Sequence, residues 1–244
     1  MPGIGDRLEG IHAVTAALHA GRVVSVVVER GPAKSAEMQQ LIRLAEAVGA
    51  SVKLVADVSP LAATSAPQGV VATARPLPTV SLADLVERAA LPALIVLDHA
   101  EDPRNVGGIA RSARAAGFDG MVISSRRAAP LGATAFKAAV GALEQLGIAV
   151  VTSIADAVRQ LRDRNVWTVA LDGAASESFY GLRILDEPVA VIVGAEGRGV
   201  SKLVAERCDV VARLPMAAGV ESLNAGVAAA LAMFEIARAR GTLS

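Results

Sequence analysis

Residues 189–199 read Val-Ala-Val-Ile-Val-Gly-Ala-Glu-Gly-Arg-Gly, and the fold class can be inferred from their pattern. Five consecutive apolar residues are typical of a strand that is buried on both faces of a parallel sheet. The glycines that follow allow close approach of the backbone to a ligand. Their spacing matches neither the dinucleotide-binding fingerprint nor a P-loop. The stretch therefore predicts a buried strand that ends in an unusual ligand-binding turn.

Similar apolar runs recur between residue 92 and the C-terminus. The expected strands cover residues 93–97, 121–124, 149–152, 167–171 and 210–214, in addition to 189–193. The stretches between them have helical length and spacing, so the pattern predicts an α/β fold with a mostly parallel sheet. In such sheets, ligands bind beyond the carboxyl ends of the strands.

A second, smaller α/β unit is expected at the N-terminus. The pattern predicts helices over 11–20 and 36–48 and strands over 23–28, 51–55 and 70–73. Pro76 and Pro78 then exclude a helix or a central strand. We therefore expect three parts: a substrate-binding domain over 1–75, a linker with a leading helix (82–89) over 76–91, and the main domain over 92–244.

Composition excludes several classes of protein. The chain has 244 residues, 53% hydrophobic and 20% charged, with 24 basic and 24 acidic side chains and one cysteine, Cys208. One cysteine allows neither a disulfide framework nor a zinc cluster. The apolar stretch 225–234 is shorter than the ~20 residues that cross a bilayer. Residues 1–7 lack the features of a signal peptide, which favours the cytoplasm.

Basic residues are concentrated in one segment although the formal net charge is zero. Between residues 104 and 137 one acid, Asp119, stands against six basic side chains: Arg104, Arg111, Arg114, Arg126, Arg127 and Lys137. This segment could hold phosphates, and a solvated arginine-rich face is an equally good interpretation of charge alone.

Two further loops after expected strands are chemically unusual. In the first, residues 98–111, Asn105 is a good helix N-cap, and Arg111 lies about 140° around the helix from apolar Val106. Arg111 should therefore face away from the core. The second loop, residues 214–224, places Ser222 and Asn224 before a helix that extends to about residue 240, where capping is the simplest role for both.

Glu196 and the final helix each lead to one further expectation. Glu196 could be functional, or could equally cap a helix or anchor its loop. The final helix carries almost no polar residue over 225–234, so it should be buried nearly all round, in the core or against another subunit.

Together, and in this order, the three loops resemble the signature motifs of the SpoU family of RNA ribose 2′-O-methyltransferases, within the SPOUT superfamily. The matching residues are Asn105, Gly107, Ile109 and Arg111 in the first motif, Gly194, Ala195, Glu196, Gly197 and Gly199 in the second, and Pro215, Ser222, Leu223 and Asn224 in the third. Residues 10–14 and 68–72 resemble the substrate-binding domain of the branch that modifies a guanosine in 23S ribosomal RNA.

The resemblance implies a C-terminal trefoil knot, S-adenosylmethionine as methyl donor, a homodimer, and structured RNA as substrate. We expect no metal. It implies a catalytic set of Arg111, Asn105, Glu196, Ser222 and Asn224. Donor contacts are expected at Gly194, Ala195, Gly197, Leu214, Met216, Ser222, Leu223 and Asn224. From the local charge we expect RNA contacts at Arg104, Arg114, Arg126 and Arg127.

Arg111 is the catalytic arginine that the resemblance implies. A guanidinium practically never loses its proton in a protein, so a role as general base is disfavoured. Our hypothesis is that Arg111 holds the target phosphate and stabilises the developing 2′-oxyanion, while Asn105 and Glu196 orient it.

Alternative functions remain open within this interpretation. A transfer-RNA 2′-O-methyltransferase is the nearest, and a non-catalytic ribosome assembly factor that kept the fold is another. A nucleotide-binding oxidoreductase fails because no glycine fingerprint follows the first strand of the main domain. His12 and His99 lack a matching nucleophile. Asp98, Glu101 and Asp102 crowd like a metal site, but they precede Pro103, where acids commonly cap turns.

Overall fold

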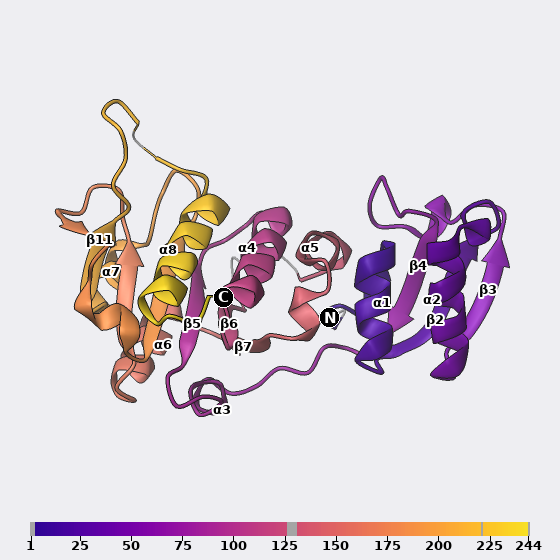
Figure 1. The fold of residues 1–244 in the computed structure, drawn as a ribbon, viewed down its shortest axis with the longest axis horizontal. Coiled ribbons are helices and arrows are strands. Elements are labelled where there is room, and N and C mark those ends of the chain that lie inside the picture. The colour runs from indigo at the N-terminus through magenta and orange to yellow at the C-terminus, as the bar shows by residue number, and fades with distance from the viewer. Residues whose placement is uncertain (1–2, 126–130, 221, 244) are drawn as a thin grey trace. The chain divides into compact units, whose positions relative to one another are not determined.

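The structure is a computed structural model that describes residues 3–125, 131–220 and 222–243. The described chain forms two compact units (Figure 1). The first comprises residues 3–78, Val106–Arg111 and 131–145, and the second comprises the rest. The division is not a single cut in the chain, because two later segments belong to the first unit.

The first unit is built around a sheet with the strand order β1-β4-β2-β3. Its strands are β1 (Arg7–Glu9), β2 (Val23–Glu29), β3 (Ser51–Val55) and β4 (Val70–Ala74). Strands β2 and β3 are parallel, and β4 is antiparallel to both β1 and β2. The helices of this unit are α1 (Ile11–His19), α2 (Ala36–Ala47) and α5 (Ala133–Ala139), and α5 packs against β1 and α1.

The second unit contains a seven-stranded, entirely parallel sheet within the described residues, with the order β7-β6-β5-β10-β8-β11-β9. The strands are β5 (Ala93–Asp98), β6 (Gly120–Ser124), β7 (Gly147–Val151), β8 (Trp167–Leu171), β9 (Glu177–Ser178), β10 (Val189–Gly194) and β11 (Val210–Arg213). The predicted α/β class with a mostly parallel sheet is therefore confirmed. Strands β5 and β10 are completely buried, as their uninterrupted apolar sequences predicted.

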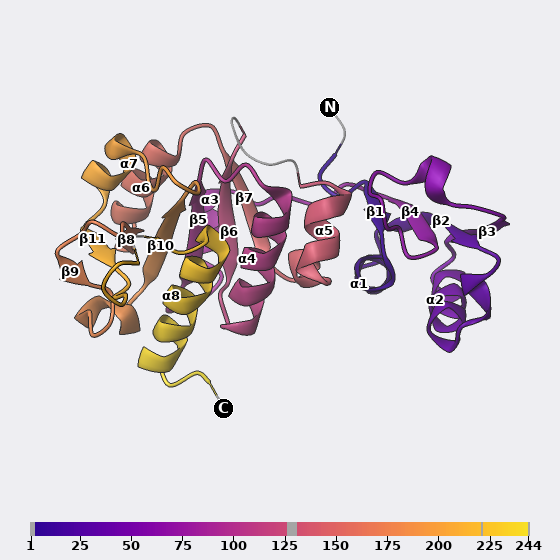
Figure 2. The ribbon, with the colours of Figure 1, turned by 90° about the horizontal axis from the view of Figure 1, so that it is seen from above.

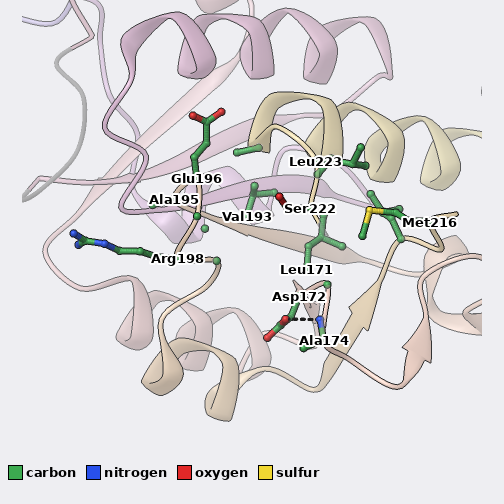
Figure 3. A pocket seen from close by; sticks show the side chains of 17 residues that line it. Leu171, Asp172, Ala174, Val193, Ala195, Glu196, Arg198, Met216, Ser222 and Leu223 are labelled. Atoms are coloured by element: carbon green, nitrogen blue, oxygen red, sulfur yellow. Dashed lines mark hydrogen bonds between the residues drawn. The ribbon is translucent and has the colours of Figure 1, made fainter. Parts of the chain in front are cut away.

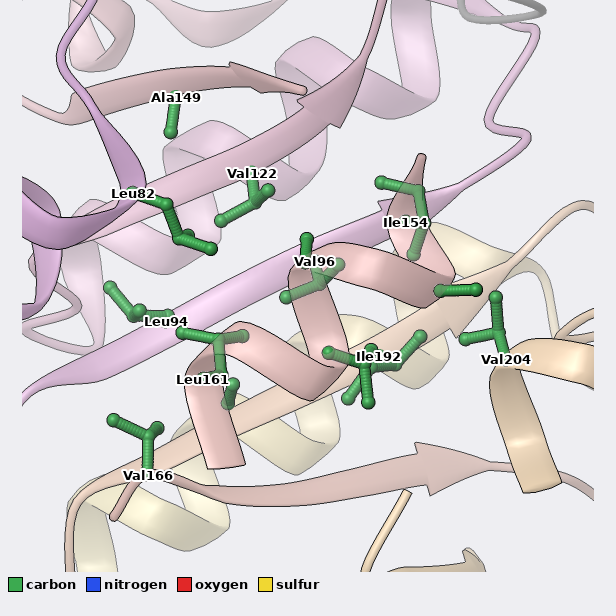
Figure 4. Close-up of a cluster of buried hydrophobic side chains, with 14 of the residues drawn as sticks. Leu82, Leu94, Val96, Val122, Ala149, Ile154, Leu161, Val166, Ile192 and Val204 are labelled. Carbon is green, nitrogen blue, oxygen red and sulfur yellow. The ribbon is translucent and has the colours of Figure 1, made fainter. Parts of the chain in front are cut away.

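Helices cover both faces of the parallel sheet (Figure 2). One face carries α3 (Leu82–Val86), α6 (Ile154–Arg162) and α7 (Lys202–Arg207), whose buried side chains form one cluster with Leu94, Val96 and Ile192 (Figure 4). The other face carries α8 (Ala225–Ala239), which packs on β10. Alternate residues of the central strands thus point into two cores.

Most predicted elements exist, with shifts of one to three residues at their ends. The leading helix ends at Val86 instead of Ala89, although a capping box of Ser81 and Asp84 fixes its start as a good N-terminal signal should. No sequence pattern predicted β1 or β9, which are three and two residues long. Helix α4 (Pro103–Ala115) begins after Asp102, so the predicted N-cap at Asn105 is wrong. Pro103 fits the first helical position, and the Asp102 carboxylate accepts a hydrogen bond from the Arg104 amide at 2.8 Å.

No helix among the described residues is long and apolar enough to cross a membrane. The last helix, α8, is buried on one face through Ala229, Met233 and Ile236. Its apolar Val227, Leu231 and Phe234 are between 41% and 48% exposed in the single chain. The helix is therefore not buried nearly all round in the core of the single chain, and its burial against another subunit stays a prediction.

We expect the two glycines Gly120 and Gly108 to respond in opposite ways to alanine. A Cβ at Gly120 would lie 2.3 Å from Leu85 Cδ1 and 2.6 Å from the Gly147 carbonyl oxygen, so Gly120→Ala should destabilise the fold by about 1–3 kcal/mol. Gly108, in α4, has no neighbouring atom within 4 Å of such a Cβ, so Gly108→Ala should stabilise by up to ~1 kcal/mol. Urea unfolding measures both, and equal effects would contradict this packing.

Candidate active site

A pocket of about 580 Å³ opens at the carboxyl ends of β8 and β10 in the second unit (Figure 3). Three separate stretches line it: the end of β8 with the following turn (Leu171–Ala174), the end of β10 with the glycine turn (193–199), and the segment that leads into α8. From the last stretch come Leu214, Met216, Ser222, Leu223, Ala225 and Ala228. The pocket thus lies where parallel sheets bind ligands.

Close backbone contact shapes the glycine turn after β10. A Cβ at Gly194 would lie 1.9 Å from the carbonyl carbon and oxygen of Gly199, so the turn returns directly over its own start. Gly197 and Gly199 have φ angles of 74° and 65°, in the left-handed region that favours glycine. Arg198 and Gly199 donate their amides to the Ala195 carbonyl. Glycine at these positions is therefore required by the geometry of the pocket wall.

Asp98 anchors the far end of this turn. In the parallel pairing of β5 with β10, Asp98 is the register partner of Gly194. Its carboxylate is 1% exposed and accepts a hydrogen bond from the Ser201 amide at 2.8 Å. A buried carboxylate needs such partners, and the His99 imidazole, with Nδ1 2.8 Å from the other carboxylate oxygen, supplies one more. Asp98 and His99 are thus explained as structural anchors of the turn.

A polar cluster of three side chains lies beside the pocket. Asn105 of α4 donates its amide Nδ2 to Glu196 Oε1 at 3.0 Å. Asn224 also donates Nδ2 to Glu196 Oε1, and to Asn105 Oδ1 at 3.3 Å. Residues that are 91 and 28 positions from Glu196 in the sequence therefore converge on one carboxylate oxygen. This geometry is compatible with Glu196 as a loop anchor and also with Glu196 as a functional carboxylate.

Asn224 has two structural roles at once. Its Oδ1 accepts hydrogen bonds from the amides of Gly226 at 2.9 Å and Val227 at 3.2 Å, which caps α8 as the sequence predicted. Its Nδ2 is at the same time committed to Glu196 and Asn105. One side chain therefore couples the start of α8 to the glycine turn and to α4.

The structure gathers most of the predicted site residues and separates others. Of the residues expected to contact a donor, the pocket lining includes Gly194, Ala195, Gly197, Leu214, Met216, Ser222 and Leu223, while Asn224 belongs to the polar cluster. Arg111 is exposed on α4, away from the buried Val106, Ile109 and Ala110, as the helical period predicted. Arg111 belongs to the first unit, whereas the residues that line the pocket belong to the second. Arg104 and Arg114 are also exposed on α4, and Arg126 and Arg127 lie outside the described residues.

Sequence reasoning missed one wall of the pocket, Leu171–Ala174. The Asp172 carboxylate accepts a hydrogen bond from the Ala174 amide at 2.8 Å, which closes a tight turn at the pocket mouth. The signal was available, because β8 was predicted and polar residues at the carboxyl end of a neighbouring parallel strand are site candidates. The order of the strands, which places β8 next to β10, was not available from the sequence.

Cys208 has ordinary structural surroundings. Burial raises the pKa of the Cys208 thiol to about 12, so the thiol stays protonated and unreactive at neutral pH. Its Sγ donates to the Val204 carbonyl at 3.2 Å.

Comparison with known proteins identifies the family. The SpoU rRNA Methylase family matches residues 92–234, and the family of RNA 2′-O ribose methyltransferase substrate-binding domains matches residues 7–80. The chain therefore belongs to the SpoU methylase family, and it is an RNA 2′-O-ribose methyltransferase.

Individual relatives extend over nearly the whole chain. The 23S rRNA (guanosine-2′-O-)-methyltransferase RlmB of Photorhabdus laumondii is 35% identical over 246 residues, which cover 98% of this chain and 100% of that protein. A TrmH family protein of Bacillus subtilis is 40% identical over 211 residues, 84% of each chain. A crystal structure of an AdoMet-bound rRNA methyltransferase from Sinorhizobium meliloti superposes with a TM-score of 0.80 at 27% identity, over 98% of this chain and 88% of that one.

Substitutions at Asn224 should separate its two roles. Asn224→Asp keeps the capping oxygen but replaces the donor to Glu196 by a second acceptor, and two adjacent carboxylates raise each other's pKa. In the folded variant, the pKa values of the two carboxylates should lie above their values in the unfolded chain. The variant should therefore be about 1 kcal/mol less stable than the wild type at pH 7. This difference should shrink as the pH falls toward 4.

Asn224→Ala provides the matched control for that experiment. It removes the cap and the contact together without adding a second carboxylate, so its loss of about 1 kcal/mol should depend less on pH than the loss in Asn224→Asp. Urea unfolding at several pH values measures both variants. A deficit of Asn224→Asp that is the same at every pH would show that Glu196 and residue 224 do not interact.

Proposed function

We propose that this protein transfers a methyl group from S-adenosylmethionine to the 2′-oxygen of a guanosine in 23S ribosomal RNA. The observation that carries the proposal is the pocket beside the Glu196 cluster at one edge of the parallel sheet. The relative from Photorhabdus laumondii supports the guanosine in 23S rRNA as the target. Such a substrate also implies the cytoplasm as the place of action.

The pocket fits S-adenosylmethionine in size and in chemistry. About 580 Å³ lies within the ~300–1,000 Å³ that small-molecule sites occupy. Leu171, Val193 and Leu214 offer apolar surface for a purine, and the glycine turn offers close backbone contact. Carboxylates of Asp172 and Glu196 favour a ligand that carries positive charge. When bound, the donor supplies an already activated methyl group on its sulfonium.

The residues of the chain must then position the RNA ribose and help its hydroxyl lose a proton. We assign Arg111 to hold the target phosphate and to stabilise the developing 2′-oxyanion, because a guanidinium forms two parallel hydrogen bonds to such groups and stays charged. Asn105, Glu196, Ser222 and Asn224 complete the proposed reacting end. Exposed Arg104 and Arg114, together with Arg126 and Arg127, are proposed to contact the RNA backbone.

Methyl transfer to unmodified large-subunit ribosomal RNA, followed by mapping of the modified ribose, tests this proposal. We expect one guanosine 2′-oxygen to be methylated by the wild type. Arg111→Ala should lose transfer, and Arg111→Lys, which keeps the charge but loses the planar fork, should lose about 100-fold or more in rate. Asp163→Asn, on an exposed ion pair of α6, is the control and should be unaffected.

Other outcomes of the same assay would reassign the protein. Transfer to transfer RNA alone would place it in the other branch of the family. Absence of transfer together with absence of donor binding would favour an assembly factor. Arg111→Lys at the wild-type rate would refute the role proposed for the guanidinium.

We further propose that the enzyme is a homodimer that pairs through α8, and that its C-terminal segment forms the trefoil knot the resemblance implies. Val227, Leu231 and Phe234 recur at helical spacing and remain exposed in the single chain. A continuous apolar stripe of this kind is typical of a subunit interface.

A charge in this stripe tests the dimer. Leu231→Glu should convert the protein to a monomer, because a carboxylate buried in an apolar interface loses its hydration without a partner. Glu235→Gln on the same helix, whose carboxylate pairs with Arg238, is the control and should stay dimeric. Sedimentation equilibrium measures both, and a monomeric wild type would contradict the proposal.

A further inference from the structure

Residues 131–145 lie within the part of the sequence that matches the methylase family. In the structure, however, they belong to the first unit. It contains α5 and a short 3-10 turn, η3 (Ala142–Glu144). The N-terminal half of α4, Val106–Arg111, belongs to the same unit. All contacts described below lie within this unit, and we name residues 131–145 the docking segment.

A buried ion pair joins the docking segment to the N-terminal sheet. Arg22, in the turn before β2, donates Nε to Glu144 Oε2 at 2.8 Å and NH2 to Glu144 Oε1 at 2.5 Å, a two-pronged pairing. The two side chains are 7% and 3% exposed. Arg22 NH1 also donates to the carbonyls of Gly5 and Arg75, and the guanidinium lies 5.7 Å from the centre of the Phe136 ring.

Other contacts also join the docking segment to the N-terminal part of this unit. The Gly5 amide donates to the Leu131 carbonyl at 3.0 Å, and a Cβ at Gly5 would lie 2.3 Å from the Phe136 ring. A Cβ at Gly141 would lie 2.7 Å from the Ala16 Cβ of α1. The Lys137 ammonium donates to the Ala66 carbonyl. Each contact spans more than 60 residues of sequence, so the docking is a tertiary feature and not a local turn.

The docking segment also packs on the helix that carries Arg111. At Gly107 of α4, a Cβ would lie 2.3 Å from the Ala135 carbonyl oxygen, 2.7 Å from the Ala138 Cβ and 3.0 Å from the Ala139 amide nitrogen. Helices α4 and α5 are therefore in backbone contact at this point. The chain of contacts runs from Arg22 through Glu144 and α5 to Gly107, one helical turn before Arg111.

We propose that Arg22 and Glu144 are positioning residues that hold the N-terminal substrate-binding domain in a fixed position relative to Arg111. RNA bound by that domain is then correctly placed at the catalytic arginine. This inference rests on the proposed function. A buried charge pair suits the task because it stabilises one geometry only: sliding would leave either charge without a partner in a dry interface.

Two variants disturb the docking in independent ways. Glu144→Gln leaves the buried Arg22 without its counter-charge. Ala16→Leu adds volume where α1 meets Gly141, without creating a buried charge. If docking positions the RNA, both should bind RNA and S-adenosylmethionine as the wild type does, yet lose ~10- to 100-fold in the rate constant for transfer to ribosomal RNA, because small misplacements of reacting groups cost rates of this size.

A rescue variant distinguishes positioning from general damage. Arg22→Met combined with Glu144→Leu replaces the pair by apolar groups of similar volume, which are usually tolerated in buried positions. We expect this double variant to recover most of the transfer rate lost in Glu144→Gln. Asp163→Asn, at an exposed pair in the second unit, is the matched control and should leave the rate unchanged.

Hydrogen exchange of residues 131–145 measures docking separately from activity. We expect slow exchange in the wild type and the double variant and faster exchange in the two disturbing variants. Faster exchange with an unchanged transfer rate would overturn the proposal, as would a rate loss matched by an equal loss of donor affinity. If the wild type methylates no RNA, the proposed function fails, while protection of the docking segment would still report whether the interface exists.

Discussion

The pairing of β10 with β5 is the constraint on which the site depends. These two central strands are parallel, completely buried, and in a register that sets Gly194 beside Asp98. Because their carboxyl ends coincide, the loops after them must share one edge of the sheet. The Asp98 carboxylate then binds the Ser201 amide and closes the glycine turn, which forms one wall of the pocket.

A single side chain links the other parts of the site to this edge. The side chain of Glu196, in the glycine turn, accepts hydrogen bonds from Asn105 on α4 and from Asn224 at the start of α8. Asn224 also caps α8, so the position of the last helix and the shape of the turn are not independent. A change in the shape of the pocket should therefore change the position of α8. The exposed apolar stripe of this helix is our proposed subunit interface.

The sequence predicted the parts of the fold that depend on local pattern and failed where the answer depends on distant contacts. Long apolar runs such as 189–193 identified the buried strands, whereas β9, two residues long, offers no pattern to read. The glycine turn was recognisable because glycine is required there by close contact with its own chain. Asp172 follows a predicted strand, but nothing in the sequence placed it at the pocket, because only the strand order brings β8 beside β10. Asn105 was assigned as a cap by its residue type, yet Asp102 and Pro103 satisfy the helix start, which leaves Asn105 free to reach Glu196.

The same distinction explains why the docking segment escapes sequence analysis. Arg22 and Glu144 are 122 residues apart, and each alone is an ordinary charged residue near a turn. Only the fold shows that both are buried and that Gly107 lets α5 approach the helix of Arg111. Part of the later sequence packs with the N-terminal sheet, so the compact units do not follow a single cut in the chain, and the domain boundary near Pro76 and Pro78 stays a prediction. A short linker would only restrict the positions that bound RNA can reach. A buried ion pair with fixed geometry defines one position of the substrate-binding domain relative to Arg111. Our proposal needs such a defined position, because the arginine must meet one particular ribose.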